Sequence, residues 1–161
     1  MAEADRAYER ALTFLERRER TEREVLEKLR GYGFTEEAMA SALDRLREAG
    51  LVDDAGYAWR YLEALIAKGR GRLRIAAEMR RKGLPEDLIR NTIEDGYTAE
   101  DERAIATEAA RRCLAEMPDE QGAAPGKAAA KVNRRLVSKG FSYEVIGSAI
   151  RRVKAEQEEE F

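Results

Sequence analysis

The residue types in this sequence favour binding through charge over catalysis. The chain has no histidine, which excludes a Ser-His-Asp or Cys-His arrangement and any histidine-based metal site. Its one cysteine, Cys113, follows two arginines in a helical pattern, and we interpret it as a small buried apolar residue and not as a reactive thiol. We therefore expect no enzyme activity, no cofactor and no metal site.

Two further patterns lack the residues that catalysis or phosphate binding would need. Neighbouring carboxylates lie at expected helix starts, where they complement the helix dipole, at 36–37, 53–54 and 100–102. The segment KGRGRLR at 68–74 lacks the third glycine of a dinucleotide fingerprint, and it follows a helix instead of a strand. Neither pattern predicts an acid–base pair or a phosphate loop.

Basic residues gather in two segments of a nearly neutral chain. Lys and Arg number 30 against 32 Asp and Glu, for a formal net charge of −2. Residues 68–82 hold seven basic residues and one acidic, a local balance of +6, and residues 127–154 hold eight and one, a balance of +7. Residues 1–53 hold ten basic and thirteen acidic, a balance of −3. The basic segments indicate contact with a polyanion or an acidic protein groove, or else ordinary solvated helix surfaces.

Thirteen cations from these segments are our candidates for partner or DNA binding: Lys68, Arg70, Arg72, Arg74, Arg80, Arg81, Lys82, Lys131, Arg134, Arg135, Arg151, Arg152 and Lys154. Four of them come first, because Glu78 alone offers an i,i+4 partner within their helix: Arg72, Arg74, Arg81 and Lys82. Replacing these four with Glu is expected to weaken partner binding and to leave helicity and melting nearly unchanged.

Aromatic residues at 57–61 allow either base stacking or core packing. Tyr57 and Tyr61 are four residues apart, and Leu65 continues their helical face, so the spacing favours the core. Trp59 lies off that face, and we expect it to be partly exposed.

The elements that carry these side chains repeat along the chain around Gly33, Gly83 and Gly140. Apolar residues stand four and eight positions before each glycine and six and ten positions after it: Val25, Leu29, Met39 and Leu43; Ile75, Met79, Ile89 and Ile93; Val132, Leu136, Ile146 and Ile150. Steps of four place each pair on one helical face, and the glycine suits a left-handed helix end. Each unit is therefore expected to contain two amphipathic helices that break at the glycine.

Helix starts extend this pattern to three helices in each unit. Thr21 and Glu24 predict a capping box, and Thr35, Ser142, Thr98, Asp53–Asp54 and the Pro85 run are natural helix starts. A further helix is expected before each pair, at 4–18, 54–68 and 99–117. We predict an all-α fold of three tandem three-helix repeats in an elongated, curved array: 1–53, 54–97 and 98–155, with a loop insertion at 118–126 and an acidic tail at 156–161. One globular helical bundle is the alternative.

The composition also bears on the compartment. No stretch approaches the apolar length of a membrane span, and the acidic start MAEADRAYER is unlike a signal peptide. A lone cysteine excludes an internal disulfide and fits a reducing cytoplasm.

Several phrases of the sequence together resemble the RecX family of bacterial recombination regulators. They are GLVDDAGYAWRYL at 50–62, GRGRLRIAAEMRRKGLPEDLI at 69–89 and GFSYEVIGSAI at 140–150, and the likeness covers about residues 5–153. The matching positions are Gly50, Leu51, Asp53, Asp54, Tyr57, Ala58, Gly71, Ile75, Lys82, Gly83, Gly140, Phe141 and Ile146.

This resemblance implies a non-enzymatic modulator of the recombinase RecA. Members are tandem three-helix repeats that lie along the RecA–single-stranded-DNA filament and limit its assembly, strand exchange, ATP turnover and RecA-assisted LexA cleavage. It thus implies a cytoplasmic, monomeric regulator of homologous recombination, DNA repair and the SOS response, with RecA as partner and single-stranded DNA as a direct, weak contact.

Two other functions fit the same residues. An independent helical DNA-binding protein would bind bare DNA with a steep salt dependence. A structural adaptor would bind neither bare DNA nor the filament.

Overall fold

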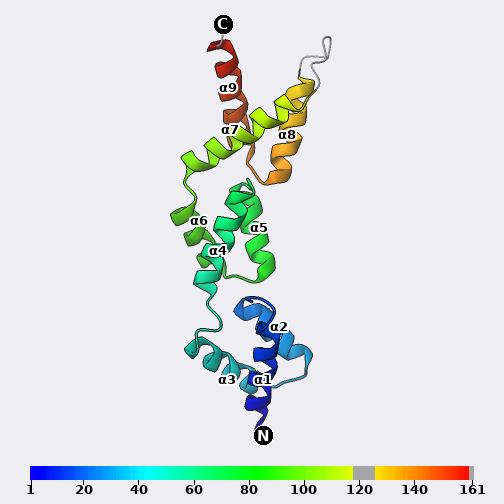
Figure 1. Cartoon of the computed structure of the whole chain (residues 1–161), viewed down its shortest axis with the longest axis vertical. Helices are drawn as coiled ribbons and strands as arrows, with labels where there is room; N and C mark the ends of the chain where they lie inside the picture. The colour runs from blue at the N-terminus through cyan, green and yellow to red at the C-terminus, as the bar shows by residue number, and fades with distance from the viewer. Residues whose placement is uncertain (118–125, 160–161) are drawn as a thin grey trace. The chain divides into compact units, whose positions relative to one another are not determined.

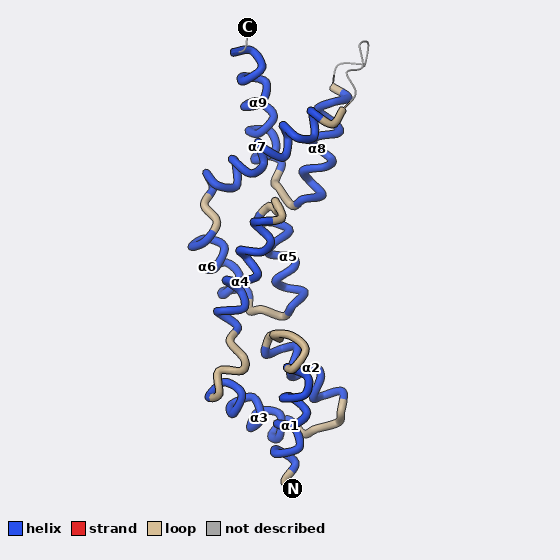
Figure 2. Tube along the Cα trace, in the orientation of Figure 1, coloured by secondary structure: helices blue, strands red, loops and turns tan. Residues whose placement is uncertain are grey.

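The computed structural model describes residues 1–117 and 126–159, which form helices joined by short loops (Figure 1). Its helices are α1 (Glu3–Leu15), α2 (Glu22–Gly31), α3 (Glu36–Glu48), α4 (Asp54–Ala67), α5 (Arg72–Lys82), α6 (Glu86–Gly96), α7 (Ala99–Ala115), α8 (Lys127–Lys139) and α9 (Tyr143–Glu159). Figure 2 shows only helix and loop in these residues. The all-α prediction is confirmed.

Two predicted segments lie wholly or partly outside the described residues. The loop insertion at 118–126 does so except for Gly126, and the acidic tail at 156–161 does so in its last two residues. α9 continues as regular helix as far as Glu159, so the described part of that tail belongs to the helix. Within the described residues, no helix combines the length and apolar character that crossing a bilayer requires.

The predicted caps are present. The Thr21 hydroxyl accepts a hydrogen bond from the backbone N–H of Glu24, and the Glu24 carboxylate accepts one from the N–H of Thr21, which completes the capping box. The hydroxyls of Thr35 and Thr98 accept from the first turns of α3 and α7 in the same way. Short side-chain acceptors satisfy the N–H groups that a helix start leaves open.

The predicted helix breaks at glycine are also present. The backbone at Gly33, Gly83 and Gly140 is left-handed, with φ of 85°, 88° and 96°. After α5, the N–H of Leu84 donates to the carbonyl of Met79 and that of Gly83 to Arg80, the pairing of a Schellman motif. All the aligned apolar positions are buried except Ile150, which is half-buried. The three glycines therefore mark equivalent positions.

The chain divides into two compact units, and the division passes through α4, α5 and α6. The first unit comprises Met1–Tyr61 and Glu78–Thr92, and the second comprises Leu62–Ala77 and Ile93–Phe161. In the first, α1 and α2 pack against α3 around Val25, Leu29 and Met39. In the second, α7 packs across α8 and α9 around Leu136, Phe141 and Ile146 (Figure 1). The repeat boundaries at 53/54 and 97/98 remain a prediction.

Within the first unit, the start of α2 is held by two segments distant in the sequence. The Thr21 hydroxyl donates to the carbonyl of Lys82 at 2.6 Å, and the N–H of Glu22 donates to the Asp54 carboxylate at 3.0 Å. A Cβ added to Gly83 would lie 2.6 Å from the Cβ of Arg23. We call this set of contacts the first junction.

Within the second unit, the start of α5 is held by the equivalent contacts. The N–H of Gly71 donates to the carbonyl of Lys139 at 2.8 Å, and that of Arg72 donates to the Glu102 carboxylate at 2.7 Å. The N–H of Leu73 adds a bond to the carbonyl of Gly140 at 3.1 Å. We call this set the second junction, and it brings the turn before α5 against the turn after α8.

Candidate functional site

The thirteen candidate cations are divided between the two units. Arg80, Arg81 and Lys82 belong to the first unit, and the other ten belong to the second. The second junction draws the first basic segment toward α8, which carries part of the second basic segment. The structure therefore brings cations of both segments together inside the second unit.

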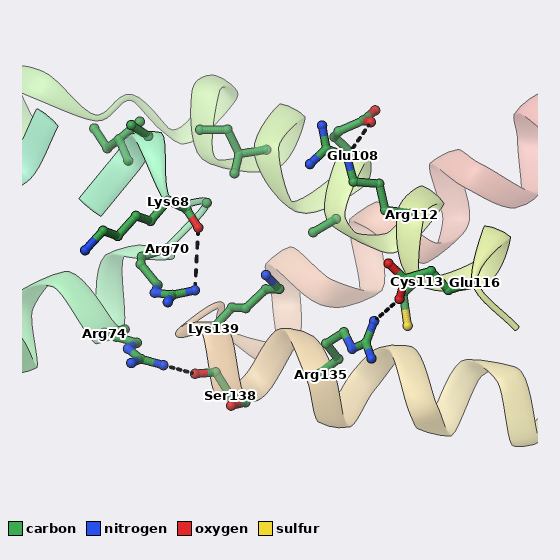
Figure 3. A pocket seen from close by; sticks show the side chains of 15 residues that line it. Lys68, Arg70, Arg74, Glu108, Arg112, Cys113, Glu116, Arg135, Ser138 and Lys139 are labelled. Atoms are coloured by element: carbon green, nitrogen blue, oxygen red, sulfur yellow. Dashed lines mark hydrogen bonds and ion pairs between the residues drawn. The ribbon is translucent and has the colours of Figure 1, made fainter. Parts of the chain in front are cut away.

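A cavity of about 660 Å³ in the second unit is lined by cations of both basic segments (Figure 3). Its lining comes from the end of α4, the turn before α5, α5 itself, α7 and α8. Six cations and two carboxylates line it: Lys68, Arg70, Arg74, Arg112, Arg135, Lys139, Glu108 and Glu116. We call it the basic pocket. Its lining thus carries six cations against two carboxylates.

Both carboxylates of the basic pocket are already paired. Arg135 donates to Glu116 at 2.6 Å, which lowers the pKa of that carboxyl and raises the pKa of the guanidinium. Glu108 accepts from Arg112 at 3.2 Å and from Arg111. Lys131 and Lys139 lower the pKa of Glu116 further through their charge. Arg111, Arg112 and Arg135 thus already neutralise the two acidic groups.

Of the other cations of the pocket, Arg74 and Arg70 donate to backbone carbonyls. Arg74 donates from Nη1 to the carbonyl of Ser138 at 3.1 Å, and Arg70 reaches the carbonyl of Lys68 at 3.5 Å. Among the described residues, the ammonium groups of Lys68 and Lys139 form no ion pair with a carboxylate. Figure 3 shows these residues around the cavity, on the α4–α5 turn, α5 and α8. The pocket therefore has a surplus of positive charge.

Most of the remaining lining residues are apolar. Ile66, Ala67, Ile105 and Ala109 line the cavity together with Cys113. Cys113 is 1% exposed, which confirms the prediction of a buried residue. No aromatic residue of the described part of the chain lines the pocket.

Arg72 has a different role from the one its charge predicts. Its Nε donates to the carbonyl of Tyr97 at 3.1 Å and lies 3.9 Å from Glu102, whose side chain is buried. Burial also raises the pKa of Tyr97, whose hydroxyl donates to the carbonyl of Arg70. These contacts argue against the prediction that melting stays nearly unchanged when all four residues become Glu, because glutamate at position 72 would place a second carboxylate beside Glu102.

The three candidates in the first unit differ from one another. Arg80 forms an ion pair with Glu86 on the exposed surface. Lys82 is half-buried, with its ammonium 5.9 Å from the ring centre of Tyr61, whose pKa is raised to about 12 by burial and by its bond to Glu78. Arg81 is exposed and forms no ion pair within the described residues. Arg81 is thus the most available of the three.

Other candidates lie at or beyond a second, smaller cavity. This cavity, of about 550 Å³, is lined by Arg72, Arg103 and Arg151 and by Glu102 and Glu144, so its charges nearly balance. Lys131, Arg134, Arg152 and Lys154 are exposed and line neither cavity. We interpret these four residues as cations of the ordinary solvated surface.

Sequence reasoning missed two cations of the basic pocket. Arg112 lies outside both basic segments, and no pattern in α7 distinguishes it from other arginines of that helix. Lys139 lies inside the second segment, just before Gly140, and it could have been selected from that position. Tyr57 is buried and Trp59 is 43% exposed, as the helical spacing predicted.

Known families match this chain in two consecutive stretches. The model described as RecX, first three-helix domain, matches residues 7–46, and the model described as RecX, second three-helix domain, matches residues 53–93.

Curated relatives extend the match over most of the chain. It is 32% identical over 149 residues to the regulatory protein RecX of Geobacillus kaustophilus, covering 92% of this chain and 54% of the relative. It is 31% identical to that of Chromohalobacter salexigens, covering 87% of this chain and 88% of the relative. The chain thus spans about half the length of the first relative and most of the second.

Two solved structures are similar in fold. The crystal structure of RecX from Lactobacillus salivarius has a TM-score of 0.83 at 22% identity, covering 95% of this chain and 97% of that chain. A crystal structure of regulatory protein RecX has a TM-score of 0.71 at 28% identity, covering 89% and 69%.

Proposed function

This chain belongs to the RecX family of regulatory proteins, and from that premise we propose that it modulates the recombinase RecA without catalysing a reaction itself. It binds the RecA–single-stranded-DNA filament and limits filament assembly. Strand exchange, ATP hydrolysis and RecA-assisted LexA cleavage fall as a consequence. We place it in the bacterial cytoplasm, acting as a monomer.

Family membership is the observation that carries this proposal. The surplus of positive charge around the basic pocket supports the proposal, because a filament that contains DNA presents many negatively charged phosphates. Long-range attraction would act mainly on the rate of association, and added salt would weaken it. The absence of histidine supports a binding role, since the residues suited to proton transfer at neutral pH are few.

The direct test measures ATP hydrolysis by RecA on single-stranded DNA while this protein is titrated in. We expect the rate to fall with increasing protein and the effect to fade as salt rises. An unchanged rate at every ratio would sink the proposal. Equal affinity for bare DNA and for the filament would instead favour an independent DNA-binding protein.

A pair of neighbouring arginines supplies a matched test of the charge argument. Arg81 forms no ion pair among the described residues, whereas Arg80 is paired with Glu86. Both are exposed at the end of α5. We expect Arg81→Gln to weaken filament binding more than Arg80→Gln, with equal melting temperatures. Equal binding by the two variants would show that this part of the first unit is solvated surface.

A further inference from the structure

The basic pocket of the second unit holds more cations than its own carboxylates can neutralise. Its two carboxylates are each engaged by arginine, at 2.6 Å for Glu116 and 3.2 Å for Glu108. Lys68, Arg70 and Lys139 remain, and none forms an ion pair with a carboxylate among the described residues. Like charges held around one cavity repel one another, and an anion in the cavity would relieve that repulsion.

The hydrogen-bonding groups of the lining indicate which class of anion could bind in the cavity. Ammonium and guanidinium groups only donate, so they need a ligand rich in acceptors. The nearest acceptors each already accept from arginine: they are the carbonyls of Lys68 and Ser138 and the two carboxylates. A peptide would bring backbone N–H groups with few acceptors to receive them. The non-bridging oxygens of a phosphodiester are acceptors only, and they suit this lining better.

We infer that the basic pocket binds phosphodiester groups of a nucleic-acid backbone, with Lys68, Arg70 and Lys139 as the contacting cations. The inference deepens the proposed function, because that function places the chain on a filament that contains DNA. The site itself needs no RecA. Since none of the described residues that line the cavity is aromatic, they offer bases no stacking platform, and binding tolerates any sequence.

The test compares two variants that lose the same charge. Lys68→Gln, Arg70→Gln and Lys139→Gln are combined in a pocket variant. Arg134→Gln, Arg152→Gln and Lys154→Gln form the control, because these exposed cations belong to the same unit and do not line the cavity. Binding to a short labelled thymidine oligonucleotide is followed by anisotropy over a range of salt. Melting temperatures of both variants confirm that they fold.

We expect the pocket variant alone to lose the affinity. Each phosphate contact on a single strand contributes about 0.7 to the slope of log affinity against log salt, so three contacts contribute about 2. This corresponds to roughly 100-fold weaker binding at about 0.1 M salt for the pocket variant. The control variant should stay within a few-fold of the unmodified protein. An equal loss in both variants would show that binding depends on diffuse charge and would overturn the inference.

Competitors identify the source of the anion. A duplex of equal length that competes as well as the single strand would support the phosphodiester assignment and show that the pocket accepts both forms. Polyglutamate that displaces the oligonucleotide more effectively, charge for charge, would assign the pocket to an acidic protein and overturn it. So would an unmodified protein that binds no oligonucleotide at low salt. A failed RecA assay with intact oligonucleotide binding would sink the proposed function alone.

Discussion

The first and second junctions solve one structural problem with different chemistry. In each, a helix start is capped by a carboxylate from a later helix, Asp54 for α2 and Glu102 for α5. The residue just before the helix also bonds the carbonyl that precedes a left-handed glycine. In the first junction that bond comes from the Thr21 side chain, and in the second it comes from the backbone N–H of Gly71.

The two junctions differ in how closely the backbones of their two segments approach each other. A threonine hydroxyl reaches outward, so the Lys82 carbonyl can stay at side-chain distance from the backbone of Thr21. At Gly71 no side chain intervenes, and an added Cβ would lie 2.5 Å from the carbonyl carbon of Gly140. The second junction is therefore a contact of backbone on backbone, which has less room to adjust. The basic pocket is built beside this tighter contact.

The largest expected effect is at Gly140. A Cβ there would lie 2.5 Å from the backbone nitrogen of Arg74, and φ of 96° is unfavourable for any residue with a side chain. We expect Gly140→Ala to lower the free energy of unfolding by about 3 kcal/mol, the sum of backbone strain and overpacking. Denaturant unfolding measures it.

Gly33 is the control for that substitution. Its φ of 85° is similar, but a Cβ there would meet no atom within 4 Å. Gly33→Ala should cost about 1 kcal/mol, from backbone strain alone. Equal losses at the two glycines would contradict the close approach at the second junction.

A smaller loss is expected at Gly83 in the first junction. A Cβ there meets the Cβ, Cγ and Cδ of Arg23; the outer two can move aside, and no main-chain atom is among these three nearest atoms. We expect Gly83→Val to cost about 2 kcal/mol, because a β-branched residue resists the left-handed backbone and displaces the arginine. Thermal unfolding checks it. A melting temperature equal to that of the unmodified protein would mean that the turn adapts freely.

Removing the capping carboxylate should also cost more stability in the second junction than in the first. Glu102 is buried at 5% exposure and bonds the N–H of Arg72 while facing its guanidinium, so Glu102→Ala should cost about 2 kcal/mol. Asp54 is less buried, and Asp54→Ala should cost about 1 kcal/mol, as for an ordinary helix cap. Urea unfolding of the two variants compares them. A larger loss at Asp54 would reverse the ranking of the junctions.

The smallest effect is a pH dependence at Asp54. Burial raises the pKa of this carboxyl above its ordinary 3.8, so the group favours the folded state at low pH and that contribution is lost as the pH rises through the folded pKa. Asparagine keeps the acceptor for Glu22 and removes the charge. The melting temperature of Asp54→Asn relative to the unmodified protein should therefore rise between about pH 3 and pH 7. A difference that falls, or that stays constant with pH, would contradict a raised pKa.

Two carboxylates show where reasoning from the sequence reached its limit. The sequence predicted that acidic residues at 53–54 and 100–102 complement their own helix starts. Asp53 does so, since it accepts from the N–H of Gly56. Asp54 and Glu102 instead cap α2 and α5, which lie far away in the sequence. Nothing in the local sequence separates these two roles, because both place an acidic residue in a first helical turn.

The helices, their breaks and their caps could be predicted from the sequence alone. Apolar spacing of four, a left-handed glycine and a Thr21–Glu24 box act over one or two helical turns, so they can be read from neighbouring residues. Family resemblance came from the same short phrases.

Which charged side chains form ion pairs within the fold, and which line the basic pocket, can be learned only from the tertiary structure. Arg72 and Arg74 are two residues apart, yet Arg72 contacts Tyr97 and Glu102, whereas Arg74 lines the basic pocket and donates to the carbonyl of Ser138. Arg112 joins that pocket from outside both basic segments. The physical reason is that an ion pair or a cavity depends on distances between segments far apart in the chain. Those distances were set by the backbone contact of Gly71 with Lys139 and Gly140.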